Sequence, residues 1–142
     1  MSSATMPDPQ PEPTLETQGF WDAAKAGKFM ISKCQKCGLH AWYPRALCPD
    51  CSDLSMALVA ATGLGTVYSF VICRRGAGIF KDWAPYVLAY VELDEGPRMM
   101  TNIIDCTPDS VEIGQRVQVK FDQTVEGYPV PRFAPAEVGS DV

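Results

Sequence analysis

Cys34-Gln-Lys-Cys37 and Cys48-Pro-Asp-Cys51, two Cys-x-x-Cys pairs with ten residues between them, decide the fold of the first part of this chain. Each pair predicts a tight turn, or knuckle, that directs two sulfurs toward one point. Two knuckles together supply the four thiolates of a tetrahedral zinc site. Because four protein sulfurs leave no coordination position for water or substrate, the metal is expected to stabilise a zinc ribbon and not to catalyse a reaction.

The residues around the two pairs favour zinc over its alternatives. Gly38 after the first pair suits a residue with positive φ, and Pro49 inside the second pair presets a turn. Disulfides are typical of a secreted chain, whereas the N-terminal residues lack the basic segment and apolar run of a signal peptide. Two pairs this close together also favour a metal over a redox dithiol. Iron uses the same ligands in rubredoxin-like sites, so the pattern leaves zinc versus iron open.

The composition predicts a globular protein of the cytoplasm. Of the 142 residues, 46% are hydrophobic and 20% are charged. No stretch approaches the ~20 apolar residues of a membrane helix, so no membrane association is expected. Six cysteines without a secretory signal indicate a reducing compartment, and the two outside the pairs, Cys73 and Cys106, are expected to be buried as small hydrophobic residues. A net charge of -5 argues against nucleic-acid binding, because phosphates need clustered cations.

The order of sequence patterns divides the chain into five parts. Residues 1–16 hold four prolines in alternation and predict a flexible tail. A helix is expected to begin at Thr17 as N-cap and to end at Gly27, and a lead-in strand follows up to residue 33. The zinc ribbon is then expected over residues 34–56, a barrel over 57–136, and a short tail over 137–142.

Five segments after the ribbon have the composition of β-strands. They are rich in β-branched and aromatic residues or alternate apolar with polar ones, and they span residues 65–73, 86–93, 98–104, 116–122 and 131–135, the last as an edge strand. A turn signal separates the second strand from the third, and a short helical turn is expected between the third and the fourth. This order indicates a mainly β fold in which a five-stranded OB-type Greek-key barrel follows the N-terminal helix and the ribbon.

Two aromatic segments are candidates for binding a ligand or a partner protein. In the N-terminal helix, Phe20 and Trp21 either pack beneath a neighbouring element or dock a partner chain, and the pattern leaves both open. The loop 74–85 joins the first two barrel strands, where binding sites are common, and Gly76 and Gly78 are expected to let it move. Its cations suit the phosphates of coenzyme A, and its aromatic rings suit an acyl or adenine pocket, a partner surface or the end of the barrel. The candidate residues here are Arg74, Arg75, Phe80, Lys81, Trp83 and Tyr86.

The sequence predicts no catalytic site. His40 is the only histidine and is expected at the surface or beside the metal, and Cys73 has no base near it in the sequence. Scattered carboxylates such as Asp82 and Glu92 are expected on solvated faces. Gly76-Ala-Gly78 is too short for a phosphate-binding loop. We therefore expect no catalysis by this chain alone.

The motifs in their order resemble a widespread family of zinc-ribbon/OB-fold proteins that accompany thiolase-like enzymes. The match runs from Phe20 to Ala136, nearly the whole folded chain. It rests on Cys34-Gln-Lys-Cys37-Gly38, Tyr43-Pro44-Arg45, Cys48-Pro-Asp-Cys51, Gly65-Thr-Val-Tyr-Ser-Phe, Pro85-Tyr86-Val, Val91-Glu-Leu-Asp-Glu-Gly96, Ile113-Gly114 and Phe133-Ala-Pro135.

The resemblance implies an accessory subunit. Family members resemble partners of thiolases, of acyltransferases that make acylated phenols, and of aldolases that shorten steroid side chains. A related domain can be fused to or associated with an enoyl-CoA hydratase, and the barrel is regarded as an acyl-CoA binding module. The catalytic residues would then lie on a thiolase-like partner in a hetero-oligomer, in lipid or steroid degradation.

Two other functions stay open at this stage. OB barrels and zinc ribbons also bind single-stranded nucleic acid, and the aromatic residues for that function are present although a basic groove is not. A salt-dependent shift with single-stranded DNA or RNA would favour it. A purely structural protein is the third hypothesis, and a partner that is fully active but less stable without this chain would support it.

Overall fold

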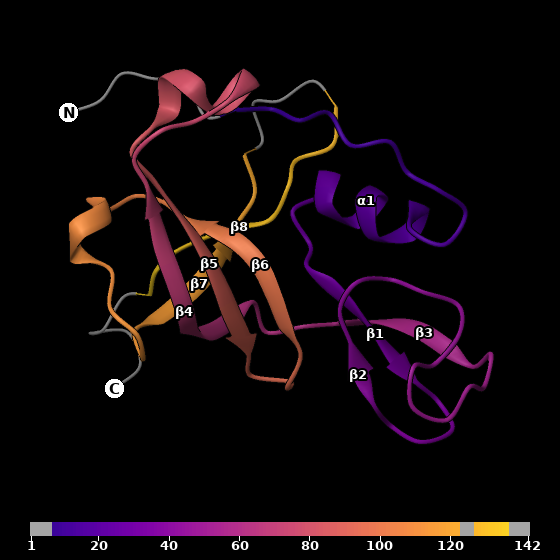
Figure 1. Ribbon diagram of the computed structural model, residues 1–142. Coiled ribbons are helices and arrows are strands. Elements are labelled where there is room, and N and C mark those ends of the chain that lie inside the picture. The colour runs from indigo at the N-terminus through magenta and orange to yellow at the C-terminus, as the bar shows by residue number, and fades with distance from the viewer. Residues whose placement is uncertain (1–6, 123–126, 137–142) are drawn as a thin grey trace.

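Helix α1 (Gln18–Lys25) is the first regular element and turns one apolar face inward. The computed structural model describes residues 7–122 and 127–136 (Figure 1). Phe20, Trp21 and Ala24 share the inner face at helical spacing, and all three are buried. No helix among the described residues is long and apolar enough to cross a membrane.

The two ends of α1 differ in how closely they follow the predicted caps. Gly27, at φ 81°, ends the helix, and the N–H of Lys28 donates to the carbonyl of Ala23 at 2.8 Å. Thr17 does precede the helix, but its hydroxyl makes no capping bond. It accepts a hydrogen bond from the N–H of Thr14 at 2.8 Å instead, so it closes the turn before the helix.

Three short antiparallel strands form the sheet of the zinc ribbon in the order β2-β1-β3. They are β1 (Met30–Cys34), β2 (His40–Ala41) and β3 (Met56–Ala60). β3 pairs with β1 along its whole length, from Ala60 opposite Met30 to Met56 opposite Cys34. Residues 57–60 therefore belong to the ribbon sheet, whereas the sequence pattern placed the start of the barrel at residue 57.

Five strands close into a barrel in the order β4-β5-β6-β8-β7, with β7 returning to β4. The strands are β4 (Leu64–Cys73), β5 (Tyr86–Leu93), β6 (Arg98–Ile103), β7 (Arg116–Lys120) and β8 (Arg132–Pro135). Two 3-10 helices interrupt them, η1 (Gly78–Trp83) between β4 and β5, and η2 (Pro108–Ser110) between β6 and β7. The predicted five-stranded OB-type barrel is confirmed.

The last strand occupies a different place from the one predicted. β8 is not an edge strand, because it lies between β6 and β7 and closes the barrel. It runs parallel to β6 and antiparallel to β7, with Phe133 opposite both Ile103 and Val119. An isolated strand pattern near the end of the chain cannot show this, since closure depends on the two partners that the strand meets.

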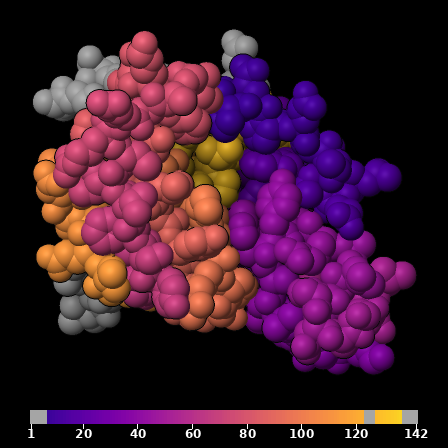
Figure 2. All heavy atoms as spheres, in the orientation of Figure 1, coloured from indigo at the N-terminus to yellow at the C-terminus, as the bar shows by residue number. Residues whose placement is uncertain are grey.

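One hydrophobic core joins the ribbon to the barrel. Phe29 lies at the junction, with its ring centroid 6.3 Å from that of Phe20, 5.9 Å from that of Trp42 and 6.2 Å from that of Phe133. Phe133 of β8 is fully buried. Figure 2 shows the ribbon and the barrel as adjoining lobes, with the N-terminal segment against both. The ribbon is therefore held by the barrel as well as by its own sheet.

The segment before α1 lies along the barrel. In Figure 1 residues 7–16 start beside η1 and cross the top of the molecule toward α1. Pro7 is buried, and its carbonyl accepts a hydrogen bond from Arg132 of β8 at 2.7 Å. The part of the expected flexible tail that the structure describes is thus attached to the barrel. Residues 1–6 and the expected tail 137–142 lie outside the described residues.

Candidate functional site

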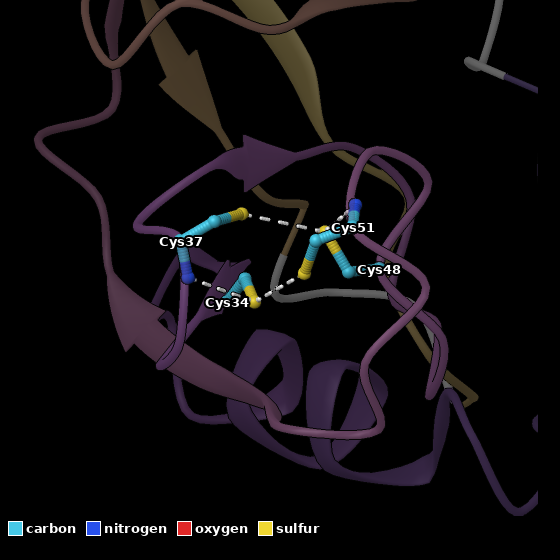
Figure 3. Close-up of side chains that lie close together, drawn as sticks. All are labelled: Cys34, Cys37, Cys48 and Cys51. Atoms are coloured by element: carbon cyan, nitrogen blue, oxygen red, sulfur yellow. Dashed lines mark hydrogen bonds between the residues drawn. The ribbon is translucent and has the colours of Figure 1, made fainter.

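The four cysteine sulfurs of the ribbon converge on one point (Figure 3). All four Sγ atoms lie within 4.8 Å of one another. The Sγ atoms of Cys34 and Cys51 are 3.7 Å apart, and those of Cys37 and Cys48 are 3.6 Å apart. A tetrahedral zinc site with Zn–S bonds of about 2.3 Å has sulfur–sulfur edges of about 3.8 Å. The four residues therefore fit a structural zinc ion.

Each knuckle is shaped by its own backbone. The N–H of Cys37 points at the sulfur of Cys34 across 3.4 Å, and the N–H of Cys51 points at that of Cys48 across 3.5 Å. Gly38 follows the first knuckle at φ 82°, as its sequence position predicted. Ser52 takes the same place after the second knuckle at φ 64°, where a non-glycine residue is uncommon.

The electrostatics of the cluster call for a cation. The backbone N–H of Cys37 lowers the pKa of Cys34 to about 7. At Cys37 the backbone N–H of Leu39 acts to lower the pKa, but desolvation within the cluster and the three neighbouring thiols raise it to about 12. Thiolates this close repel one another, so without metal the cluster must hold some of its protons. A divalent cation removes this repulsion, and with all four positions taken by sulfur it supplies stability and no reactive site.

The loop 74–85 forms a compact aromatic cluster around η1. The rings of Trp83 and Tyr86 stack with centroids 5.1 Å apart at 15°, and Phe80 lies 5.6 Å from Tyr86. Phe80, Trp83 and Tyr86 are all half-buried, so each ring keeps an accessible part. A side chain at position 76 would overlap the carbonyl oxygen of Phe80, so Gly76 is needed for the close packing of this loop.

The cations of the same loop are exposed. Arg75 and Lys81 are exposed. Arg74 is exposed too, and it forms an ion pair with Asp109 of η2 at 3.3 Å. An exposed pair of this kind contributes little stability, so Arg74 can exchange partners at small cost. The structure therefore brings the predicted aromatic rings together and leaves the predicted cations exposed on the same loop.

Phe20 and Trp21 lie in the interior. Phe20 is fully buried, with its ring edge-on to Trp21 at 4.9 Å and to Trp42 at 5.2 Å. Trp21 is 5% exposed, and its indole N–H donates to the hydroxyl of Tyr43 at 3.0 Å. Of the two interpretations that the sequence left open, this burial favours packing between helix and ribbon over direct contact with a partner.

Two features were not found from the sequence, one of them buried and the other on the surface. Arg132 is 5% exposed at the start of β8, and its guanidinium lies over the ring of Trp83 at 5.2 Å. The sequence pattern at residues 131–135 predicted only an edge strand and did not indicate that Arg132 contacts Trp83. The outer face of β4, β5 and β6 exposes Tyr68, Tyr90 and Met100, which the alternation of the strands could have shown.

Two family models match the chain in tandem. The model described as "ChsH2, rubredoxin-like zinc ribbon domain" matches residues 21–57, and "ChsH2, C-terminal OB-fold domain" matches residues 58–122. A four-cysteine ribbon joined to a closed five-stranded barrel therefore defines a zinc-ribbon/OB-fold protein.

The relatives define the family further. A DUF35 domain-containing scaffold protein of Methanothermobacter thermautotrophicus is 40% identical over 96 residues, which are 67% of this chain and 72% of that protein. A probable enoyl-CoA hydratase alpha subunit of Thermomonospora curvata is 33% identical over 129 residues, 89% of this chain but 40% of that longer protein. A solved structure titled "Ltp2-ChsH2(DUF35) aldolase" shares 31% identity and a TM-score of 0.79, covering 89% of this chain and 99% of the matched chain. The chain belongs to the DUF35 family, in the form with a ChsH2-type zinc ribbon and OB fold.

Proposed function

We propose that this chain is a non-catalytic accessory subunit of a thiolase-like enzyme, such as a thiolase, an acyltransferase or a side-chain aldolase. The observation that carries the proposal is the match of nearly the whole fold to the DUF35 chain of an aldolase, at a TM-score of 0.79. Relatives named as scaffold proteins and as a hydratase alpha subunit support a role inside a complex. The chain would help to assemble the complex and to bind the acyl-CoA substrate, in the degradation of lipids or steroids.

The chemistry of the described residues supports the non-catalytic part of the proposal. The metal cluster offers four sulfur ligands and no open coordination position. His40 lies in the short strand β2, and among the described residues no contact joins it to a nucleophile. Cys73 lies against the Tyr86 hydroxyl, and burial raises the pKa of this phenol above its ordinary value. A phenol that holds its proton more tightly does not activate a thiol, so this pair lacks a base.

The surface of the loop 74–85 supports the contact part of the proposal. Ile79 is 56% exposed beside the partly accessible rings of Phe80 and Trp83, and exposed apolar groups of this kind often mark interaction sites. The exposed Arg75 and Lys81 add positive charge to an acidic protein. This combination suits the phosphates and the adenine of coenzyme A, or an acidic rim on the partner subunit.

Replacing Trp83 by Ala tests this surface. We expect Trp83→Ala to weaken assembly with the partner, or binding of coenzyme A, by about 2 kcal/mol or more, which is typical of an aromatic hot spot. Zinc content should stay at one per chain, because Trp83 lies in the barrel loop and not in the ribbon. Isothermal titration with coenzyme A and with the thiolase-like partner measures the effect.

Ile113→Ala is the matched control, because Ile113 is 69% exposed and lies outside the loop. It should bind like the wild-type chain. The contrary outcome is a Trp83→Ala chain that is partly unfolded but whose folded fraction binds coenzyme A and the partner normally. Trp83 would then be a residue of the barrel core, and the loop would not be part of the contact surface.

A further inference from the structure

Arg132 is a buried cation that binds a segment far from it in the sequence, at Pro7. Its guanidinium donates to the Oδ1 of Asn102 at 3.3 Å and lies over the ring of Trp83 at 5.2 Å. Its Nη2 donates to the carbonyl of Pro7 at 2.7 Å, across 125 positions of sequence. Burial of a cation is unfavourable unless hydrogen bonds and charges compensate it, so the Pro7 carbonyl is part of what stabilises Arg132 in this position.

The charge of the same segment matches Arg132. Burial lowers the pKa of Arg132, while the negative charges of Asp122 and Asp8 act in the opposite direction. Asp8 directly follows the carbonyl that Arg132 binds, and its Oδ1 accepts a hydrogen bond from the N–H of Gln10 at 3.1 Å. This bond forms a turn that ends at Gln10, which has φ 54°. Residues 7 and 8 therefore bring to Arg132 a carbonyl that accepts its hydrogen bond and, in the next position, the negative charge of Asp8.

We propose that the surface formed by Arg132 and Trp83 is a binding site for a short segment that contains proline and aspartate, and that residues 7–10 occupy it in cis as a strap. The strap binds the guanidinium through the Pro7 carbonyl, and because the same guanidinium lies over the ring of Trp83, it links the strap, β8 and η1. Release of the strap would remove the Pro7 carbonyl from a guanidinium that lies over Trp83, a residue of the loop 74–85. The inference concerns the chain alone and does not depend on the proposed function.

Loosening the strap in the full chain tests the first consequence. We expect the combined substitution Pro7→Gly, Asp8→Ser and Pro9→Gly to raise amide hydrogen exchange across residues 78–86 by about 10-fold, because glycines favour the released segment. Exchange in α1 and in the ribbon, and the zinc content, should stay unchanged. Glu12→Gln is the matched control in the exposed part of the same segment and should leave residues 78–86 as in the wild type. Unchanged exchange of residues 78–86 in the strap variant would overturn the proposal.

A synthetic peptide with the sequence of residues 7–13 tests the site directly. The strap variant should bind it in a saturable manner and shift the indole N–H resonance of Trp83 back to its wild-type position. The wild-type chain should need at least ~10-fold more peptide, because a tethered segment competes at an effective concentration on the order of 1 mM. A peptide with Lys in place of Asp8 should bind at least ~10-fold more weakly. Absence of binding to the strap variant, or equal binding of both peptides, would contradict an acidic segment site at Arg132.

Discussion

Replacing Cys48 by Ser is expected to abolish stoichiometric zinc binding and to unfold the ribbon. Cys48 is fully buried and provides one of four sulfurs that lie within 4.8 Å of one another. Structural zinc contributes on the order of 10 kcal/mol to the folding of small zinc domains, and a serine oxygen is a poor substitute for a thiolate. Elemental analysis should fall from one zinc per chain to a small fraction of that. Hydrogen exchange should then show lost protection over the knuckles and β3, while the central barrel strands β5 and β6 stay protected.

Cys106→Ser controls for the chemical change in this experiment. Cys106 is half-buried and lies outside the four-sulfur cluster, so its replacement should leave the zinc content unchanged. A Cys48→Ser chain that still holds one zinc, with the ribbon protected, would show that the four cysteines do not form the site. Purified wild-type protein without any stoichiometric metal would refute the zinc ribbon itself.

Replacing Phe20 by Ala should destabilise the folded chain by about 3–5 kcal/mol, which is typical for a fully buried phenylalanine. The ring contacts Trp21, Phe29 and Trp42, so its loss leaves a cavity where the helix, the ribbon and the barrel meet. Chemical denaturation of the zinc-loaded protein measures the change in the free energy of unfolding.

Leu15 offers a matched control just before the same helix, because its side chain is completely exposed. Leu15→Ala should change stability by no more than about 0.5 kcal/mol. A Phe20→Ala chain that is as stable as the wild type but binds a partner subunit more weakly would contradict this. Phe20 would then be a contact residue and not a core residue.

The parts of the fold that depend on local pattern could be predicted from the sequence. The two Cys-x-x-Cys pairs and the glycine after the first pair predict the first knuckle, because ligand spacing and positive φ are local properties. The strands β4 to β7 follow from their β-branched composition and alternation. The loop 74–85 could be selected because its aromatic and basic residues are close together in the chain.

The remaining features depend on contacts between distant segments. The strand pattern at residues 131–135 does not reveal that β8 closes the barrel between β6 and β7. The pairing of β3 with β1, which extends the ribbon to residue 60, is also set by the partner strand. Phe20 and Trp21 could equally have been a surface pair, since a helix with two adjacent aromatic residues does not show what covers it. The contact between Arg132 and Pro7 joins the two ends of the described chain and has no local signal.

Acyl-CoA turnover, measured for this chain alone, for a candidate thiolase-like partner and for their mixture, tests the proposed accessory role most directly. We expect no thiolysis or retro-aldol cleavage by this chain alone, because a four-sulfur metal site has no open coordination position and the described neighbour of Cys73 is the phenol of Tyr86 and not a base. The mixture should form a stable complex and should turn over acyl-CoA faster than the partner does by itself. Robust turnover by this chain alone, or a partner whose rate and stability are the same with and without it, would contradict the account.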